Sequence, residues 1–593
     1  MRIFKKVWMF ALAVLLIPGF SACDDFLDKE YDASLSEEKV FGNERLTRQF
    51  LTNIYTNLPD GIGIFGDFQF QSASRDAMTD NATTWWGLHW YNMVNNDSYT
   101  ATNHPMLGFW NTNFSGIRKA NQFLKNIDPN VIQNQPLAGD DNNLYDRYRA
   151  EAILLRAMFH FELVAYFGDA PILEDIVLDM DNQEQMNMVR QPAAEVLKWV
   201  AEQCDLVKDL LPFRYSSSGN WGRVSGATAY ALKSRALLYR ASNLHNPNGM
   251  TAWWQEAADA AKAFIDKNAQ QSNPFALYNS YERMFYEAPY LNDEIILSRS
   301  IWNTNAIETQ VLPPGFPGMN GKTNPSQNFV DAFEMANGRF IWEDESGYDP
   351  NNPYVDRDPR FYATVLYHGA MWGREDLGQR RAIDVHMNNA NEKGIDYEGS
   401  NGGTLTGYYM RKFVNPNVDF ENLGVFPHAW IIYRYAEILL NYAEALNEAQ
   451  GPVSDVHWAI NQVRARVDMP ELPSGLSQED MRKRIRNERR VELCFEDHRF
   501  FDLRRWRAYD GRTYESELAQ YEVDGRFDNK LLVIGGVNVR RAGAITRYNR
   551  MVVSERGGRR VFNVPKNYLF PVPYNETIKS PNLGQNPGWS IEE

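Results

Sequence analysis

Cysteine is scarce in this chain of 593 residues, and the scarcity excludes a fold built on disulfides. Only Cys23, Cys204 and Cys494 occur in the sequence. Their separation does not match the spacing of a zinc site or of a disulfide framework. Cys204 and Cys494 each lie among apolar residues of a predicted helix, where a free thiol behaves as a small core side chain. We therefore predict no functional thiol in the body of the chain.

Long apolar runs are also missing beyond the N-terminus. The run at 7–17 is shorter than the roughly 20 apolar residues of a spanning helix, and it follows a basic start that includes Arg2 and Lys5. This pattern is typical of a signal peptide. Small residues lead into Cys23, where a bacterial lipobox places its lipidated cysteine. We expect residues 1–22 to be a lipoprotein signal peptide and Cys23 to carry the lipid. An ordinary signal peptide with a chance cysteine is the alternative.

Signatures of metal-dependent and nucleophilic catalysis are missing as well. The nine histidines form no H-E-x-x-H pattern, and the sequence contains no G-x-S-x-G elbow. The net charge of −15 becomes −18 once the three cations of the signal peptide are removed. A strongly acidic chain is an unfavourable partner for nucleic acid. We expect no enzymatic activity, no cofactor, no metal site and no nucleic-acid partner.

Helical periodicity, in contrast, is abundant. Apolar residues recur at three- and four-residue spacing, which is the period of an amphipathic helix. Repeated helix pairs that bury their apolar faces on one another are typical of tetratricopeptide solenoids. The pattern predicts a mainly α fold with a tetratricopeptide-like scaffold, and a generic all-helical protein is the alternative. The predicted pairs are 36–58 with 108–127, 144–167 with 192–211, 225–244 with 253–266, and 433–449 with 456–467, followed by one further helix over 478–506.

Long irregular segments separate these helices. The periodicity fades into Gly, Pro, Asn and aromatic residues, with short β-like runs at 531–534 and 560–564. Long loops in a compact protein are either functional or disordered, and abundant aromatic residues argue against disorder. After the signal peptide we therefore treat 23–593 as one binding protein. Its expected parts are a helical scaffold at 33–58, 108–270 and 430–507, ligand-binding loops at 59–107 and 271–429, and an irregular C-terminal region at 508–593.

A set of sequence motifs spans nearly the whole chain. The motifs are CDDFLD at 23–28, YFGDAP at 166–171, RYAEILLNYAEA at 434–445, IRNERRVEL at 485–493 with RFFDLRRW at 499–506, and YLFPVP at 568–573 with QNPGW at 585–589. They resemble the motifs of the SusD/RagB family of outer-membrane nutrient-binding lipoproteins.

This resemblance implies both a function and a location. It implies a lipoprotein of the bacterial outer membrane that faces the cell exterior. It also implies that the protein binds a nutrient, an oligosaccharide or polysaccharide, and delivers it to a SusC-like TonB-dependent transporter. RagB-like members are associated with peptide uptake, so a peptide ligand is the first alternative. A structural partner of the transporter without its own ligand is another. A glycoside hydrolase is the weakest alternative, because it needs two suitably placed carboxylates, for which the candidates are Asp76, Asp80, Glu343 and Asp344.

The predicted loops contain the candidate binding residues. Indole rings stack on the apolar C–H faces of sugars, while sugar hydroxyls need oriented donors and acceptors. An alternative is that the tryptophans pin a long loop to the scaffold. The candidates are Trp85, Trp86 and Trp90 for stacking and Arg75, Asp80 and Asn92 for polar contacts in 59–107, with Trp302 and Phe316 in 271–429.

A dense charge cluster at 486–504 could be mistaken for an acid/base site. Its opposite charges recur three and four residues apart, which suits ion pairs along and between helices. We interpret the cluster as architectural. Its members are Arg486, Glu488, Arg489, Arg490, Glu492 and Arg504.

Overall fold

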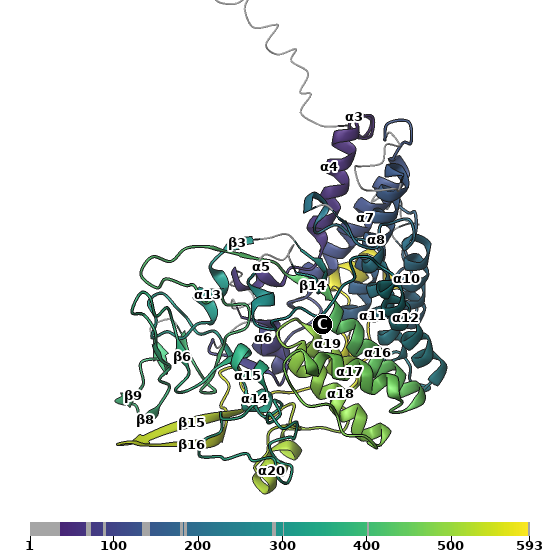
Figure 1. The fold of residues 1–593 in the computed structure, drawn as a ribbon. Helices are drawn as coiled ribbons and strands as arrows, with labels where there is room; N and C mark the ends of the chain where they lie inside the picture. Colours follow the sequence, from purple (N-terminus) through teal and green to yellow (C-terminus); the bar gives the residue numbers. More distant parts are fainter. Residues whose placement is uncertain are drawn as a thin grey trace, which may run out of the picture.

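The predicted helical periodicity forms a stack of paired helices, as Figure 1 shows for the computed structural model. Each helix of this stack packs on the next one in chain order. The mainly α class is therefore confirmed. The helices of the stack are α4 (Glu44–Ile54), α7 (Leu107–Asn126), α8 (Leu144–Phe167), α10 (Ala193–Val207), α11 (Gly226–Ala241), α12 (Thr251–Ala269) and α16 (Tyr435–Gln450), with the short α3 (Glu37–Phe41) before them. The structure describes residues 36–66, 73–86, 90–132, 143–177, 182, 185, 187–216, 218–287, 292–299, 302–399 and 402–590.

Local capping signals set the ends of the helices that the sequence placed best. At the start of α8, the side chain of Asn143 accepts a hydrogen bond from the backbone N–H of Tyr145, which satisfies a free donor of the first turn. At its end, Gly168 adopts a φ of 73°, a conformation that glycine takes without a Cβ penalty. Ser225 and Thr228 form a reciprocal capping box at the start of α11. The bounds predicted for α8 are confirmed.

The predicted single helix over 478–506 is wrong. It is divided into α18 (Gln478–Glu492) and α19 (His498–Arg505), which follow α17 (Ser454–Ala465). Between them, Phe495 and Asp497 have positive φ values of 59° and 67°, which are unfavourable for residues with a side chain. The break directs the buried Glu496 carboxylate toward Arg434 at 2.7 Å and Lys412 at 2.8 Å. These ion pairs offset the cost of the break.

Small antiparallel sheets and short helices occupy the other side of the molecule from the stack (Figure 1). They join segments that lie far apart in sequence, so the two predicted loop regions form one body. The sheets are β1 (Ala82–Thr84) with β4 (Thr323–Pro325), β2 (Ile295–Ser298) with β14 (Ile431–Arg434), β3 (Trp302–Thr304) with β13 (Phe426–His428), β5 (Val365–Leu366) with β12 (Tyr409–Met410), β6 (Met371–Trp372) with β7 (Arg381–Ala382), β8 (Met387–Asn389) with β9 (Glu392–Lys393), and β10 (Glu398–Gly399) with β11 (Gly402–Gly403). The short helices are α5 (Gly61–Gly66), α6 (Trp90–Asn95), α13 (Ala306–Val311), α14 (Gln327–Val330) and α15 (Pro359–Thr364).

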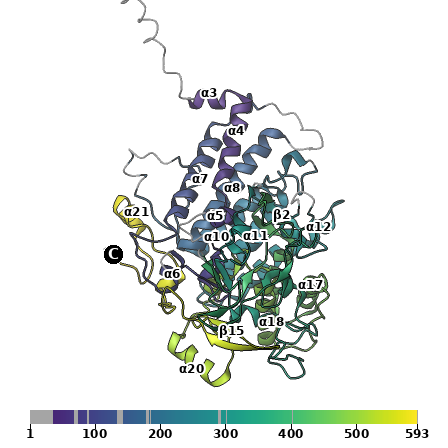
Figure 2. The ribbon, with the colours of Figure 1, turned by 90° about the vertical axis from the view of Figure 1, so that its left-hand side faces the viewer.

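The C-terminal region is more regular than the sequence predicted. It contains α20 (Tyr514–Asp524), α21 (Tyr574–Lys579) and a hairpin of β15 (Gly535–Ala542) with β16 (Ile545–Val552). Figures 1 and 2 both place α20 and this hairpin at the end of the molecule opposite α3 and α4.

The β-like runs predicted at 531–534 and 560–564 are not strands, so that expectation was wrong. Leu531, Leu532 and Val533 donate their backbone N–H groups to the carboxylate of Glu517. Because one side chain accepts these bonds, the segment needs no neighbouring strand.

Buried ion pairs connect the helix stack to the loops. Glu492 in α18 contacts Arg434 at 2.7 Å and Arg466 at 2.5 Å, and it also reaches Arg360 at the start of α15. Glu488 likewise pairs with Arg360, at 2.5 Å. The architectural interpretation of the charge cluster is confirmed for these two residues and for the members Arg489 and Arg490, which pair with Asp502 and Asp80.

Candidate functional site

Trp85 and Trp86 follow directly after β1, where the two predicted loop regions meet. In the β1–β4 sheet, Thr84 lies opposite Thr323. Trp86 is 36% exposed, and Trp85 is partly exposed. Two adjacent indoles therefore present apolar ring surface to solvent on the loop side of the molecule.

A cation from a distant segment lies against each of these indoles. The guanidinium of Arg556 lies 4.3 Å from the ring centre of Trp85, and the ammonium of Lys322 lies 4.7 Å from that of Trp86. Such contacts favour one orientation of an aromatic ring. Sequence reasoning missed Arg556 and Lys322, because they lie far from the tryptophans along the chain and carry no local signal.

Asn92 fixes the backbone beside the indoles. Its side-chain amide donates a hydrogen bond to the carbonyl oxygen of Trp86 at 2.8 Å. Gly557 packs so closely on it that an added Cβ would lie 2.6 Å from the Cβ of Asn92. The buried Asn92 therefore links the tryptophan segment to the C-terminal region that carries Arg556. In this arrangement its amide binds the protein backbone.

The predicted polar contact Asp80 lies beneath the tryptophan segment and is fully buried. Its carboxylate pairs with Arg490 at 2.7 Å and with Arg499 at 2.8 Å. Burial alone would raise the pKa of Asp80, but Arg490 and Arg499 outweigh it and hold the pKa below its ordinary value. The structure therefore gives Asp80 an anchoring role, in place of direct contact with a ligand.

Arg560 adds a second anchor beneath β1. Its guanidinium donates to the carbonyl oxygens of Thr79 and Ala82, at 2.5 and 2.9 Å, and pairs with Glu555 at 2.8 Å. Glu555 in turn accepts a hydrogen bond from the Thr83 hydroxyl at 2.6 Å. The segment that precedes the exposed indoles is thus fixed to the protein interior through its backbone carbonyls and the Thr83 side chain. Such support pre-organises a binding surface.

Arg75 is also buried, so its predicted contact with a ligand is not available in this structure. It pairs with Asp497 at 3.1 Å and donates to the Tyr166 hydroxyl at 2.5 Å. Its guanidinium also lies 5.0 Å from the ring centre of Phe109. Arg75 therefore anchors the loop to α7, α8 and the break before α19.

The other predicted aromatic residues belong to separate elements of the loop side. Trp90 is the first residue of α6 and is partly exposed. Trp302 begins β3, opposite His428, and its side chain lies outside the described part of the structure. Phe316 is only 3% exposed, because its ring stacks on Phe420 at 4.3 Å and is covered by Arg381. Phe316 therefore does not form an exposed rim.

The carboxylates considered for hydrolysis do not form an accessible pair. Asp76 and Asp80 are both buried, and burial raises the pKa of Asp76 to about 6. Glu343 pairs with Arg484 at 2.7 Å, and its neighbour Asp344 is exposed. A glycosidase needs an acid and a base or nucleophile on either side of one accessible bond. This arrangement does not favour hydrolysis.

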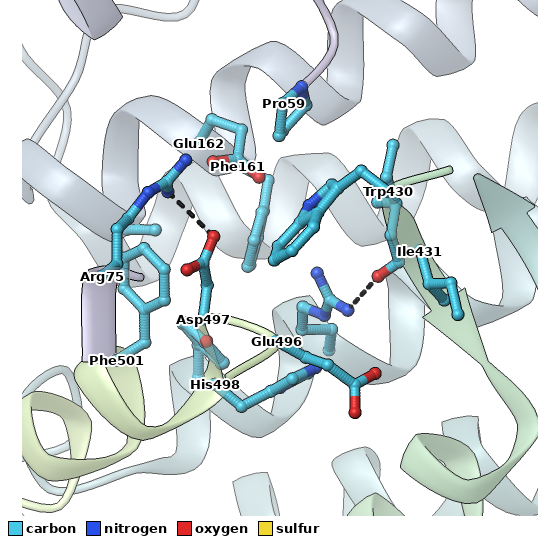
Figure 3. Close-up of a pocket in the computed structure, with 14 residues that line it drawn as sticks. Pro59, Arg75, Phe161, Glu162, Trp430, Ile431, Glu496, Asp497, His498 and Phe501 are labelled. Carbon is cyan, nitrogen blue, oxygen red and sulfur yellow. Dashed lines mark hydrogen bonds and ion pairs between the residues drawn. The ribbon is translucent and has the colours of Figure 1, made fainter. Parts of the chain in front are cut away.

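A small pocket lies where α8, β14 and the break before α19 meet (Figure 3). Its volume is about 40 Å³, which suits water rather than a sugar ring. Within the described ranges, the Glu162 carboxylate in its wall has no hydrogen-bond or ion-pair partner. Burial raises the pKa of Glu162 to about 7, although Arg235 and Arg75 act in the opposite direction.

Glu162→Gln is expected to stabilise the protein at pH 8 and to have little effect at pH 5. A raised pKa in the folded state favours folding below the ordinary value of 4.5, and this contribution is lost as the pH rises through about 7. At pH 8 the free energy of unfolding of the variant is expected to exceed that of the wild type by at most about 3 kcal/mol. Urea unfolding of both proteins at pH 5 and pH 8 measures it. Equal differences at the two pH values would show that Glu162 titrates normally.

Comparison with known proteins gives the family. Residues 299–589 match the model described as "SusD family", and residues 25–238 match the one described as "Starch-binding associating with outer membrane". The two matched regions share no residue and together cover most of the chain. The chain belongs to the SusD family.

Curated SusD-like relatives support this assignment over most of the sequence. SusD-like protein P2 of Formosa agariphila is 24% identical over 423 residues, which cover 70% of this chain and 74% of the relative. SusD-like protein P25 of the same organism is 24% identical over 541 residues, which cover 84% and 90%.

Solved structures of SusD-like proteins share the fold. A SusD-like protein from Bacteroides fragilis aligns with a TM-score of 0.71 and 25% identity, covering 93% of this chain and 99% of that one. A second protein from this species, described as a SusD-like carbohydrate-binding protein, aligns with a TM-score of 0.69 and 24% identity, covering 92% and 100%. The SusD-like fold expected from the sequence motifs is therefore confirmed.

The predicted membrane attachment falls outside the described residues, because the signal peptide and Cys23 lie within 1–35. Across the described ranges, no helix of this SusD-family chain combines the length and the apolar character needed to cross a bilayer. In the same part of the chain, no group of three or more His, Cys, Asp or Glu side chains is arranged to hold a metal ion.

Proposed function

We propose that this SusD-family chain is a surface-exposed lipoprotein that binds a nutrient glycan and delivers it to a partner SusC-like TonB-dependent transporter. The observation that carries the proposal is the pair of solvent-facing indoles, Trp85 and Trp86, on a segment held from below by buried ion pairs. The description of a similar solved protein as carbohydrate-binding supports the same class of ligand.

The chemistry of the indole pair suits a sugar. Pyranose rings carry apolar C–H faces that cover an indole, and the hydroxyls around the ring need hydrogen-bonding groups nearby. The exposed guanidinium of Arg556 lies beside Trp85 and can donate to such hydroxyls. Lys322 is buried, and it supports Trp86 from within the protein. Trp90 and Trp302 are proposed to extend the stacking surface. Arg75, Asp80 and Asn92 support it from within the protein.

The proposed delivery requires reversible binding. A ligand that passes to a transporter has to dissociate on the time scale of uptake, and dissociation slows as affinity rises. An exposed stacking surface on the outside of the loops provides modest affinity without enclosing the ligand. The diacylglycerol expected at Cys23 would keep the site at the membrane, because two acyl chains anchor a protein stably.

A screen of the chain from Asp24 onward against neutral and acidic oligosaccharides, with a peptide mixture alongside, tests the ligand class. Thermal shift provides the first reading and calorimetry the second. We expect a saturable response to at least one saccharide. A response to peptides together with silence across the saccharides would replace the glycan with a peptide ligand. Silence in both sets would contradict nutrient binding by the isolated chain.

A further inference from the structure

A second groove lies between α18, the segment at 340–343 and the segment at 508–531. Its volume is about 730 Å³, within the range of small-ligand sites. The tryptophan surface described above contributes no side chain to its wall. The wall combines basic and aromatic residues, chiefly Phe340, Trp342, Arg484, Arg486, Trp506 and Arg526.

Basic residues predominate in this groove although the whole chain is acidic. Several of the guanidinium groups pair with carboxylates, two of which, Glu343 and Asp528, also line the groove. Arg484 pairs with Glu334 and Glu343, and Arg526 pairs with Asp528. These ion pairs have an architectural explanation that requires no ligand.

Arg486 is different, because no carboxylate neutralises it. Within the described ranges it forms no hydrogen bond or ion pair, and its Nε is enclosed without a partner. Its guanidinium lies 4.5 Å from the ring centre of Trp506, a contact that leaves the N–H donors unused. Burial lowers the pKa of Arg486, although the more distant Glu444 and Glu448 act in the opposite direction. The residue is partly exposed, so its terminal N–H groups remain open to a ligand while the buried Nε lacks a partner. A buried donor without a partner costs free energy, and a bound anion that accepts from the guanidinium would offset this cost.

Two further guanidinium groups in the wall of the groove also favour an anion. Arg490 and Arg499 also line the groove, and both pair with the same carboxylate, Asp80. Burial lowers the pKa of Arg490 to about 10, opposed by Asp80 and reinforced by Arg499. The two guanidinium groups share one direct carboxylate partner, and Asp528 and Asp331 act on Arg490 from farther away.

Aromatic rings complete the groove. Phe340 and Trp342 stack with their ring centres 4.8 Å apart and their planes 8° apart. Arg484 lies 4.0 Å from the ring centre of Phe340, and Arg526 lies 4.4 Å from that of Trp342. Each ring is stacked on the other and has a guanidinium over it, so the partly exposed rings border the basic wall chiefly with their edges. A ligand that satisfies both features carries a negative group on a ring with an apolar face.

We propose that this groove binds an acidic saccharide unit, with its carboxylate or sulfate on Arg486 and its ring against Trp342. A guanidinium fork matches both anions, since each presents two oxygens to parallel N–H donors. The site would act in addition to the neutral stacking surface at Trp85 and Trp86. It would favour glycans that contain uronic acid or sulfate ester residues.

Calorimetry on the full chain from Asp24 onward tests this site with three probes of equal length, a uronic-acid oligosaccharide, a sulfated oligosaccharide and a neutral one. Arg486→Gln is expected to weaken binding of the acidic probe about tenfold, the effect of losing hydrogen bonds to a charged group. Lys483→Gln is the matched control. It removes a positive charge from the same helix and the same groove, but from an exposed ion pair with Glu479, so we expect less than about a twofold change.

Two further variants keep the test decisive. Trp342→Ala alters the aromatic part of the groove and leaves Arg486 in place. It is expected to weaken binding of the acidic probe severalfold. The double variant Trp85→Ala/Trp86→Ala is expected to retain the affinity for the acidic probe, which separates this site from the proposed function. The proposal is overturned if wild type binds neither acidic probe, if it binds the neutral probe equally well in this groove, or if Arg486→Gln and Lys483→Gln weaken binding equally.

Discussion

Glu492→Gln is expected to lower the free energy of unfolding by about 3 kcal/mol, the low end for breaking a buried ion pair, because the three guanidinium groups it contacts each lose one carboxylate and keep another. Glu492 contacts Arg434, Arg466 and Arg360 within the protein. The variant leaves all three guanidinium groups short of one carboxylate. Urea unfolding followed by circular dichroism at pH 7 measures the change.

The pH dependence of this difference provides an internal check. Burial alone would raise the pKa of Glu492, but Arg466, Arg434 and Arg360 outweigh it and hold the pKa well below its ordinary value of 4.5. The carboxylate therefore stabilises the fold above pH 4.5, and this stabilisation is lost as the pH falls. The difference in free energy of unfolding between the variant and the wild type is therefore expected to become smaller as the pH falls below 4.5.

Glu479→Gln is the matched control for the Glu492 variant. Glu479 lies on the same helix, but its ion pair with Lys483 is exposed to solvent. Exposed pairs contribute about 0.5 kcal/mol or less, so this variant should unfold almost like wild type. If both variants lost the same small amount of stability, the buried network would not hold the loops to the helix stack.

Trp85→Ala/Trp86→Ala is expected to weaken binding of a neutral oligosaccharide about a hundredfold, because two rings that cover a sugar together contribute about 3 kcal/mol through buried apolar area. Thermal stability should change little, since the anchors at Asp80 and Arg560 remain in place. Calorimetry with the saccharide that gives the largest thermal shift measures the loss.

Trp458→Ala is the control for the tryptophan variant. Trp458 is 41% exposed, but it lies on α17 of the helical scaffold. Its replacement should leave the affinity within about twofold of wild type, the variation typical of a surface substitution. Unchanged affinity in the double variant would remove Trp85 and Trp86 from the site.

The helices that could be predicted are those whose limits are set by neighbouring residues. Asn143 and Gly168 mark the ends of α8 within a few residues of the apolar pattern. The break after α18 could not be predicted, because it is stabilised by contacts of Glu496 with Arg434 and Lys412, which lie in other segments of the chain. The same reason applies at 531–533, where Glu517 replaces a strand partner.

The sequence indicated which residue types gather around the candidate site, but it did not show which of them reach the surface and which are buried in ion pairs. Neighbouring tryptophans in a loop indicated a stacking surface, and the structure places Trp85 and Trp86 at the surface. The sequence could not show that Asp80 pairs with Arg499, because the two residues are 419 positions apart. It also could not distinguish Arg486 from its paired neighbours, since the absence of a partner depends on the packing of several segments.

Hydrogen exchange of the full chain with and without a saturating neutral oligosaccharide tests the central claim most directly. We expect protection of the backbone amides of Trp85 and Trp86 and of the segment around Lys322, which lies against Trp86. The helix stack from α7 to α12 should exchange as in the free protein. Protection confined to the helix stack, with no change at these loop segments, would contradict glycan binding at the tryptophan surface.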